Sequence, residues 1–138
     1  MVFSSLEIPV SLIKYSLAFA LGAFLYTVIE ILWRGYTHVS MTLTGGVCLV
    51  LLYMWNAYLT DTHLLVKCAI GAVTITAVEF LVGCTVNLWL GLSVWDYSAM
   101  PFNLMGQVCL GYSAMWFGLC IPAYFICELV RRYDEFTM

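Results

Sequence analysis

Four long apolar runs dominate this sequence, at about residues 10–33, 42–59, 65–90 and 101–130. Each can cross a bilayer, because the hydrocarbon core takes about 20 residues in helical form. Only 9% of the 138 residues are charged and 64% are hydrophobic, whereas a soluble domain carries about 25% charged residues. Such a chain cannot cover itself with polar groups, so its surface must face lipid. We therefore expect an all-α integral membrane protein with a single transmembrane domain over residues 1–138.

Charge and cysteine usage exclude several classes of protein. The net charge of −3 offers no basic surface for phosphates, so we expect no nucleic-acid partner. The six cysteines stand singly in apolar stretches without C-x-x-C pairs; we interpret them as packing residues and predict no disulfide, metal site or cofactor. The segment before the first run carries Glu7 and no basic residue, which favours a membrane span over a cleaved signal.

The basic residues predict an orientation in the cell membrane. An even number of spans puts both termini on one side, together with the turn at residues 60–63. Four of the five basic residues fall on that side, and Arg34 alone lies on the other. The positive-inside rule then places both termini in the cytoplasm. Aromatic residues mark both borders as an interfacial belt: Trp33, Tyr36, Trp89, Trp95 and Tyr97 outside, and Tyr15, Tyr58 and Tyr133 inside.

The connections between the runs carry capping signals. Residues 35–38 join the first pair, and Ser40 is placed to cap the second helix. The third connection is longer, at residues 91–100, and Pro101 suits the first position of a fourth helix. Within it, Asp96 and Ser98 are expected to cap that helix, while Trp95 and Tyr97 anchor it at the interface. The alternative is a lid that folds over the bundle and brings Asp96 toward the third run.

The chain also repeats itself. Gly, Ala, Thr and Glu of residues 22–30 recur in register at residues 71–79, and residues 45–49 with 54–55 resemble residues 106–110 with 115–116. These matches predict a duplicated two-helix hairpin, with units at about residues 10–60 and 65–130. The units would be related by a pseudo-two-fold axis along the membrane normal, a parallel repeat. The alternative is chance, because short apolar strings draw on few residue types.

Two carboxylates fall inside the predicted spans, Glu30 and Glu79. Charged groups inside a bilayer cost several kcal/mol and usually have a function. At 1.5 Å per residue, Glu30 lies about 24 Å beyond Lys14, in the outer half of the membrane. Arg34 follows Glu30 by four residues, the spacing of a same-face ion pair, so Glu30 is either structural or part of a site. Glu79 has Gly83 at the equivalent position and therefore no partner within its own helix.

The start of the fourth run adds amides. Asn103 and Gln107 lead into Gly111, Ala114 and Gly118, a pattern that predicts one interior helix face. We expect Glu79 to face the bundle interior within reach of Asn103, Gln107 or Arg34. His38 is either a ligand or proton carrier or simply a solvated loop residue. The predicted substrate- or ion-binding set has no catalytic member and consists of Glu30, Arg34, Glu79, Asp96, Asn103 and Gln107.

Glu30 with Arg34 and His38, the pair Gly45-Gly46, and above all residues 94–110 (VWDYSAMPFNLMGQVCL) resemble a known family. It is the family of small bacterial membrane proteins described as putative ABC-transporter type IV. The resemblance implies a transport-related membrane protein and supplies no catalytic or binding residues. The sequence has no Walker A pattern, so we do not expect a complete ATP-driven pump.

These observations favour a transporter component or channel-like protein, as a homo-oligomer or within a larger membrane complex, because four spans are few for a permease. One alternative is an intramembrane enzyme acting on a lipid or isoprenoid, with Glu79 or Asp96 as acid or base. It ranks lower, because no metal motif or nucleophile constellation supports it. The other alternative is an assembly or regulatory partner in which the Glu residues are structural.

Overall fold

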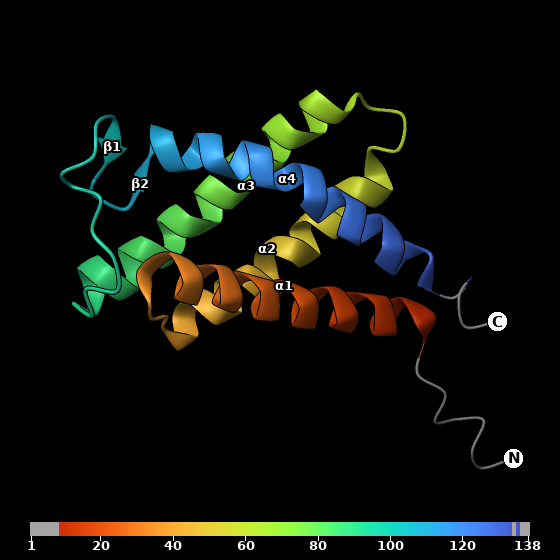
Figure 1. Cartoon of the computed structure of the whole chain (residues 1–138), viewed down its shortest axis with the longest axis horizontal. Coiled ribbons are helices and arrows are strands. Elements are labelled where there is room, and N and C mark those ends of the chain that lie inside the picture. Colours follow the sequence, from red (N-terminus) through yellow and green to blue (C-terminus); the bar gives the residue numbers. More distant parts are fainter. Residues whose placement is uncertain (1–8, 134, 136–138) are drawn as a thin grey trace, which may run out of the picture.

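The computed structural model describes residues 9–133 and 135 and has the expected all-α architecture. The helices are α1 (Val10–Arg34), α2 (Val39–Tyr58), α3 (Leu64–Gly83), which continues as the π-helix η2 (Cys84–Trp89), and α4 (Leu110–Arg131) (Figure 1). The spans Val10–Arg34, Val39–Tyr58, Leu64–Trp89 and Leu110–Arg131 are long and apolar enough to cross a membrane. The segment around Glu7, which argued against a cleaved signal peptide, lies outside the described residues.

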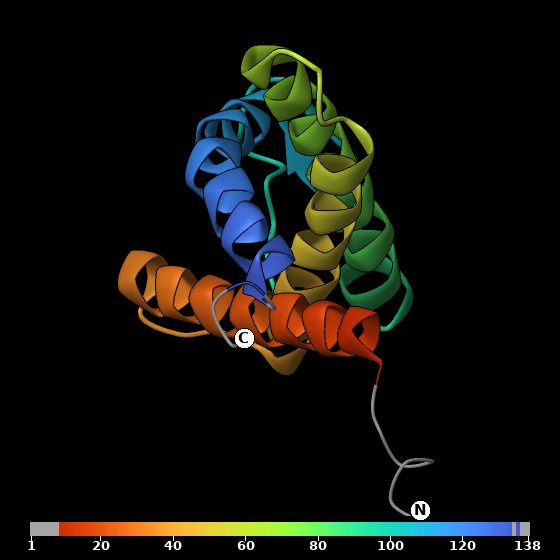
Figure 2. The same ribbon diagram turned by 90° about the vertical axis from the view of Figure 1, so that its right-hand side faces the viewer.

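The connections gather at two ends of the bundle (Figure 1). One end, called here the terminal end, holds the start of α1, the 59–63 connection and the end of α4. The opposite end, the loop end, holds residues 35–38 and 90–109. α1 lies along one side of the group formed by the other three helices (Figure 2). This arrangement is the one an even number of spans requires.

Histidines cap the two central helices. Nδ1 of His38 accepts a 3.1 Å hydrogen bond from the Ser40 backbone N–H, and Nδ1 of His63 accepts one of 3.2 Å from that of Leu65. The expectation that Ser40 caps α2 is wrong, because the helix begins at Val39 and Ser40 lies in its first turn. Each imidazole satisfies an N–H group that a helix start leaves without an intrahelical partner.

The fourth helix begins later than predicted. Residues 101–109 form a small hairpin, in which β1 (Asn103–Leu104) pairs antiparallel with β2 (Val108–Cys109). Positive φ angles at Phe102 (54°), Met105 (55°) and Gly106 (72°) are incompatible with a right-handed helix. Pro101 therefore does not start α4, and neither Asp96 nor Ser98 caps it, since the residue before its first turn is Cys109. Asn103 and Gln107 likewise do not lie on a helix face.

Small residues let α1 and α2 approach closely. A Cβ atom added to Gly22 would overlap the Gly45 carbonyl, and one added to Gly45 would overlap Cβ of Tyr26. Beside this crossing, the hydroxyls of Thr27 and Thr42 share a 2.7 Å hydrogen bond. Close backbone packing and hydroxyl bonds between helices are typical of membrane bundles, where burial of apolar surface no longer drives association.

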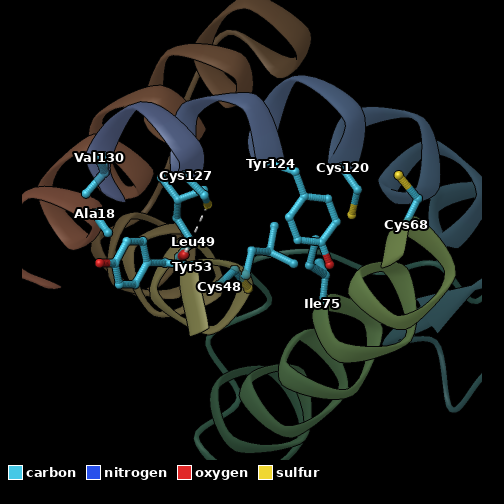
Figure 3. Packing of buried hydrophobic residues seen from close by; sticks show 11 residues of the cluster. Ala18, Cys48, Leu49, Tyr53, Cys68, Ile75, Cys120, Tyr124, Cys127 and Val130 are labelled. Atoms are coloured by element: carbon cyan, nitrogen blue, oxygen red, sulfur yellow. Dashed lines mark hydrogen bonds between the residues drawn. The ribbon is translucent and has the colours of Figure 1, made fainter. Parts of the chain in front are cut away.

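The largest buried cluster draws on all four helices (Figure 3). Its members include Ala18, Cys48, Leu49, Leu52, Tyr53, Cys68, Ile75, Cys120, Tyr124, Cys127 and Val130. All six cysteines are free thiols, and Cys84 alone among them is not fully buried. Small thiols filling an apolar interior agree with their interpretation as packing residues.

The interior face of α4 differs from the predicted one. Gly111, Ala114 and Gly118 are exposed on this chain, whereas Cys120 and Tyr124 are buried. The prediction assumed one continuous helix from Asn103 through Gly118. Residues 103–109 form a hairpin instead, so the predicted face does not exist. The buried face of α4 is set by residues at and beyond Trp116 instead.

Candidate functional site

Glu79 is a carboxylate buried inside the bundle. It lies in α3 with 3% of its surface exposed. Oε2 accepts a 2.9 Å hydrogen bond from the indole Nε1 of Trp116 in α4. Oε1 is buried and makes no hydrogen bond of standard geometry among the described residues, while the Tyr97 phenol also interacts with this carboxylate. Trp116 therefore fixes the position of Oε2, whereas Oε1 can accept a hydrogen bond or pair with a cation.

A cavity of about 140 Å³ lies beside Glu79 and is called here the Glu79 cavity. All four helices contribute to its wall, with Tyr26 from α1, Cys48 from α2, Glu79 from α3 and Trp116 from α4 among the lining residues. Pro122, which cannot donate a backbone hydrogen bond within α4, also lines it. The wall is mostly apolar, and among the described residues Glu79 is the one carboxylate that lines it.

Glu30 and Arg34 form the ion pair that their spacing predicts. Nε of Arg34 lies 2.6 Å from Oε2 of Glu30. Nη1 of Arg34 also donates a 2.8 Å hydrogen bond to the Val94 carbonyl, and the guanidinium lies 4.4 Å over the Tyr36 ring. Arg34 thereby joins the end of α1 to the long loop at residues 90–109.

A second cavity, of about 90 Å³, lies beside this ion pair and is called here the Arg34 cavity. Tyr26 and Trp116 line both cavities, and their ring centroids lie 5.7 Å apart. On its far side Tyr97 stacks on Tyr112 at 4.7 Å. The rings of Tyr26 and Trp116 thus form a wall that the two cavities share.

The long loop folds against the bundle, and its aromatic residues face inward. Trp95 is 6% exposed and donates a 2.9 Å hydrogen bond to the Gln107 carbonyl, so it is not an interfacial anchor. Tyr97 is half-buried, and burial raises the pKa of its phenol, which keeps it neutral. Asp96 is exposed and accepts a 2.9 Å hydrogen bond from the Ser98 N–H, and hydrogen bonding from Ser98 lowers the pKa of its carboxyl. The loop covers the bundle as the lid alternative requires, but without bringing Asp96 inward.

Three amides hold this loop in place, Asn103 and Gln107 of the predicted site and Asn87, which was not predicted as part of it. Asn87 of η2 accepts from the Val94 N–H at 2.7 Å and donates to Oε1 of Gln107 at 2.8 Å. Nε2 of Gln107 donates to the Met105 carbonyl at 2.9 Å, and Asn103 accepts from the Gly106 N–H at 3.0 Å. These hydrogen bonds stay within the loop and η2 and do not reach Glu79.

The structure therefore divides the six predicted residues into two groups. Glu30, Arg34 and Glu79 border the two adjacent cavities. Asp96, Asn103 and Gln107 belong to the long loop, whose Tyr97 lines the Arg34 cavity. Gly83 permits the contact between α3 and the loop, because an added Cβ would lie 2.7 Å from Oε1 of Gln107.

Sequence reasoning missed the role of the aromatic partners. Trp116 appeared only as part of the repeat, opposite Trp55. That correspondence gave no signal for the bond to Glu79, because Trp55 donates to the Thr74 hydroxyl of α3 at 3.0 Å and a two-fold repeat would direct Trp116 toward α1.

A polar network at the terminal end was also missed. Buried Asn56 donates to Oε2 of Glu128 at 3.0 Å and accepts from Nζ of Lys67 at 2.7 Å. Glu128 pairs in turn with Arg131 at 2.5 Å and with Arg132 at 3.0 Å. The network links α2, α3 and α4 at the terminal end of the bundle.

Comparison with known proteins identifies the family of the chain. No solved structure matches the chain. Residues 46–136, well over half of the chain, match the family described as putative ABC-transporter type IV. The matched region contains α3, the long loop and α4, and with them Glu79, Trp116 and the loop sequence on which the resemblance rests. The chain therefore belongs to the putative ABC-transporter type IV family and is an ABC-transporter-related, multi-pass membrane protein.

Proposed function

We propose that this protein is a small transporter component or channel-like protein whose binding site is the Glu79 cavity. The observation that carries the proposal is a buried carboxylate with one unpartnered oxygen beside a cavity inside the bundle. Leucine at this position would avoid the cost of burying a polar group in an apolar interior. Ionisable residues that face a bundle interior usually mark substrate or ion pathways.

The two carboxylates differ in whether a cation neutralises them. Glu30 is matched by Arg34 at 2.6 Å, and Arg34 is further fixed by the Val94 carbonyl. Glu79 accepts a hydrogen bond from the neutral indole of Trp116 and interacts with the neutral phenol of Tyr97, and no cation pairs with it among the described residues. In this proposal the Glu30–Arg34 pair is structural and fixes the loop at the edge of the site, while Glu79 provides the binding group.

Duplication of a two-helix hairpin is part of the proposal. Thr27 and Thr76, which correspond in the sequence repeat, each share a hydroxyl hydrogen bond with the following helix, with Thr42 at 2.7 Å and with Ser113 at 2.8 Å. The matched tryptophans do not follow this relation, because both donate into α3, whereas a two-fold axis would direct Trp116 toward α1. Gly45 and Gly106 also correspond in the sequence repeat, but here the two units differ. Gly45 lies within α2, whereas Gly106 lies in the hairpin turn. A parallel repeat would have given both units a carboxylate, of which Glu30 pairs with Arg34 and Glu79 has no cationic partner among the described residues.

The orientation and assembly follow from the sequence arguments. The terminal end carries Lys14, Lys67, Arg131 and Arg132 and is proposed to face the cytoplasm. The Glu79 cavity then lies toward the outer half of the membrane. Because four helices enclose only a small cavity, a continuous pathway is proposed to require a homo-oligomer or a larger complex.

Proton flux tests the proposal, because a proton is the smallest cation that a carboxylate can carry. The purified chain would be reconstituted into liposomes with a trapped pH-sensitive dye, and a potassium gradient with valinomycin would set an interior-negative potential. Wild type should acidify the interior faster than protein-free liposomes. Glu79→Gln, which keeps an acceptor for Trp116, should remove that difference, and Asp61→Asn, exposed at the terminal end, should not.

Either of two results would overturn the proposal. A Glu79→Gln variant with wild-type flux would make Glu79 structural. Wild-type liposomes indistinguishable from empty ones would remove the stand-alone transport function and leave the role of an assembly partner.

A further inference from the structure

We infer that the Glu79 cavity binds a small organic cation, a protonated amine or quaternary ammonium of roughly the volume of benzene. This ligand class rests on the proposed function, since it assigns the substrate of the same site. The inference combines the free carboxylate oxygen, the aromatic rings and the size of the cavity.

The charge of the site selects a cation. None of the described residues that line the Glu79 cavity is basic. The nearest guanidinium, that of Arg34, lines the neighbouring Arg34 cavity and is engaged by Glu30, the Val94 carbonyl and the Tyr36 ring. An anion in the Glu79 cavity would meet a carboxylate and no counter-charge. A cation would satisfy Oε1 of Glu79, the buried oxygen that lacks a partner.

The chemistry of the wall selects an organic cation over a metal ion. Mg²⁺ and Ca²⁺ need about six to eight oxygen ligands. The Glu79 cavity offers one carboxylate among mostly apolar groups, and the described part of the chain holds no cluster of three His, Cys, Asp or Glu residues. An alkylammonium ion requires less, because its charge pairs with one carboxylate while its carbon atoms contact apolar walls.

Aromatic rings stand where such a cation would bind. Tyr26 and Trp116 line the cavity with ring centroids 5.7 Å apart. Rings of this kind attract ammonium groups through their negative faces, and sets of aromatic side chains are the usual receptors for quaternary ammonium ligands. Trp116 also donates to Oε2 of Glu79, which directs the carboxylate toward the same cavity. The charge and the rings therefore converge on one volume.

The size of the cavity indicates the size of the charged group that it can hold. Its volume is about 140 Å³, and an apolar cavity of about 150 Å³ holds benzene. Tetramethylammonium suits this volume. A longer alkyl substituent would extend beyond this volume, and the Arg34 cavity of about 90 Å³, which shares Tyr26 and Trp116, lies next to it.

The binding experiment uses tetramethylammonium chloride and the full chain in detergent. Tetramethylammonium chloride replaces sodium chloride at constant ionic strength. It should raise the melting temperature of wild type in a saturable manner. The neutral molecule tert-butanol, of similar size, should not. Glu79→Gln should weaken the apparent affinity at least tenfold, as should Trp116→Leu, whereas Asp61→Asn should bind as wild type does.

A second measurement needs no variant. Dicyclohexylcarbodiimide should modify Glu79 in the wild-type chain, and tetramethylammonium should protect it at the concentrations that shift the melting temperature. Peptide mass spectrometry gives the modified fraction. Absence of both the thermal shift and the protection would overturn the inference, as would equal binding by wild type and Glu79→Gln.

The two proposals fail in different ways. Proton flux that depends on Glu79, without any response to tetramethylammonium, would retain the transport function and reject the ligand class. Binding that depends on Glu79, in a protein that gives no flux in liposomes, would retain the ligand class and reject stand-alone transport.

Discussion

The indole Nε1 of Trp116 lies 2.9 Å from Oε2 of Glu79 and joins α4 to α3 in the interior of the bundle. This bond holds one carboxylate oxygen and leaves Oε1 without a partner among the described residues. The two residues are 37 positions apart in the chain. A donor from another helix thus fixes the orientation of the group that the proposed site depends on.

Removing this donor while keeping an aromatic ring should destabilise the protein. Trp116→Phe removes the hydrogen bond to Oε2 of buried Glu79, and we expect a loss of about 1–3 kcal/mol in the free energy of unfolding. Unfolding in a detergent series gives the value. In the double variant with Glu79→Gln the losses should not add, because the two residues interact directly.

The matched control is Trp89→Phe. Trp89 is 79% exposed, so its replacement should change stability by no more than about 0.5 kcal/mol. Equal unfolding of Trp116→Phe and wild type would show that the indole hydrogen bond is not needed to hold Glu79.

Asn87 should control the order of the long loop. Asn87→Ala leaves the Val94 N–H and Oε1 of Gln107 without the partner that they share. We expect faster hydrogen–deuterium exchange across residues 94–97, measured by mass spectrometry, because these amides would open locally. Leu92→Ala, at an exposed position of the same loop, should exchange as wild type does. Unchanged exchange in Asn87→Ala would mean that Trp95 alone keeps the loop docked.

The spans were predictable because the bilayer dictates length and composition. The first run was expected to end at Trp33, and α1 ends at Arg34. The start of α4 was not predictable, because residues 101–109 are apolar enough to extend a span. What breaks the helix there is positive φ at Phe102 and Met105, residue types that give no such signal in a sequence.

The site was predictable only in part. The cost of a carboxylate within a span singled out Glu79, and an i,i+4 spacing gave the Glu30–Arg34 pair. The partner of Glu79 comes from another helix, and an indole in an apolar run is indistinguishable from a packing residue. Asn103 and Gln107 were assigned to the site through a helical register that the hairpin removes.

The crossing of α1 and α2 should not tolerate a side chain. Gly45→Ala places a methyl group against Cβ of Tyr26, and we expect a loss of about 1–3 kcal/mol because the backbones must separate. Gly118→Ala meets nothing within 4 Å and should be neutral, or stabilising by up to about 1 kcal/mol through helix propensity. Thermal unfolding of the two variants in the same detergent compares them. Equal melting temperatures would contradict the close packing.

The proposed orientation predicts which loop reacts from outside the cell. In a cysteine-free background, a cysteine at position 96 should react with an impermeant thiol reagent, because Asp96 is exposed at the loop end. A cysteine at position 61, exposed at the terminal end, should react only after the membrane is permeabilised. The reverse pattern would place the Glu79 cavity toward the cytoplasm.

Asn56 should be the residue on which the terminal end depends most. It is 5% exposed and connects Lys67 of α3 with Glu128 of α4. Asn56→Leu leaves Nζ of Lys67 without this acceptor and removes one donor from Glu128, so we expect a loss of about 1–3 kcal/mol in the free energy of unfolding.

Arg132→Gln is the control for Asn56→Leu. The Arg132 side chain is 52% exposed in its ion pair with Glu128, and exposed pairs contribute no more than about 1 kcal/mol. Unfolding measured at low and high salt separates the two, because screening weakens an exposed ion pair much more than a buried amide. The Asn56→Leu deficit should therefore persist at high salt. A deficit that disappears there would mean that surface charge, and not the buried amide, joins the three helices.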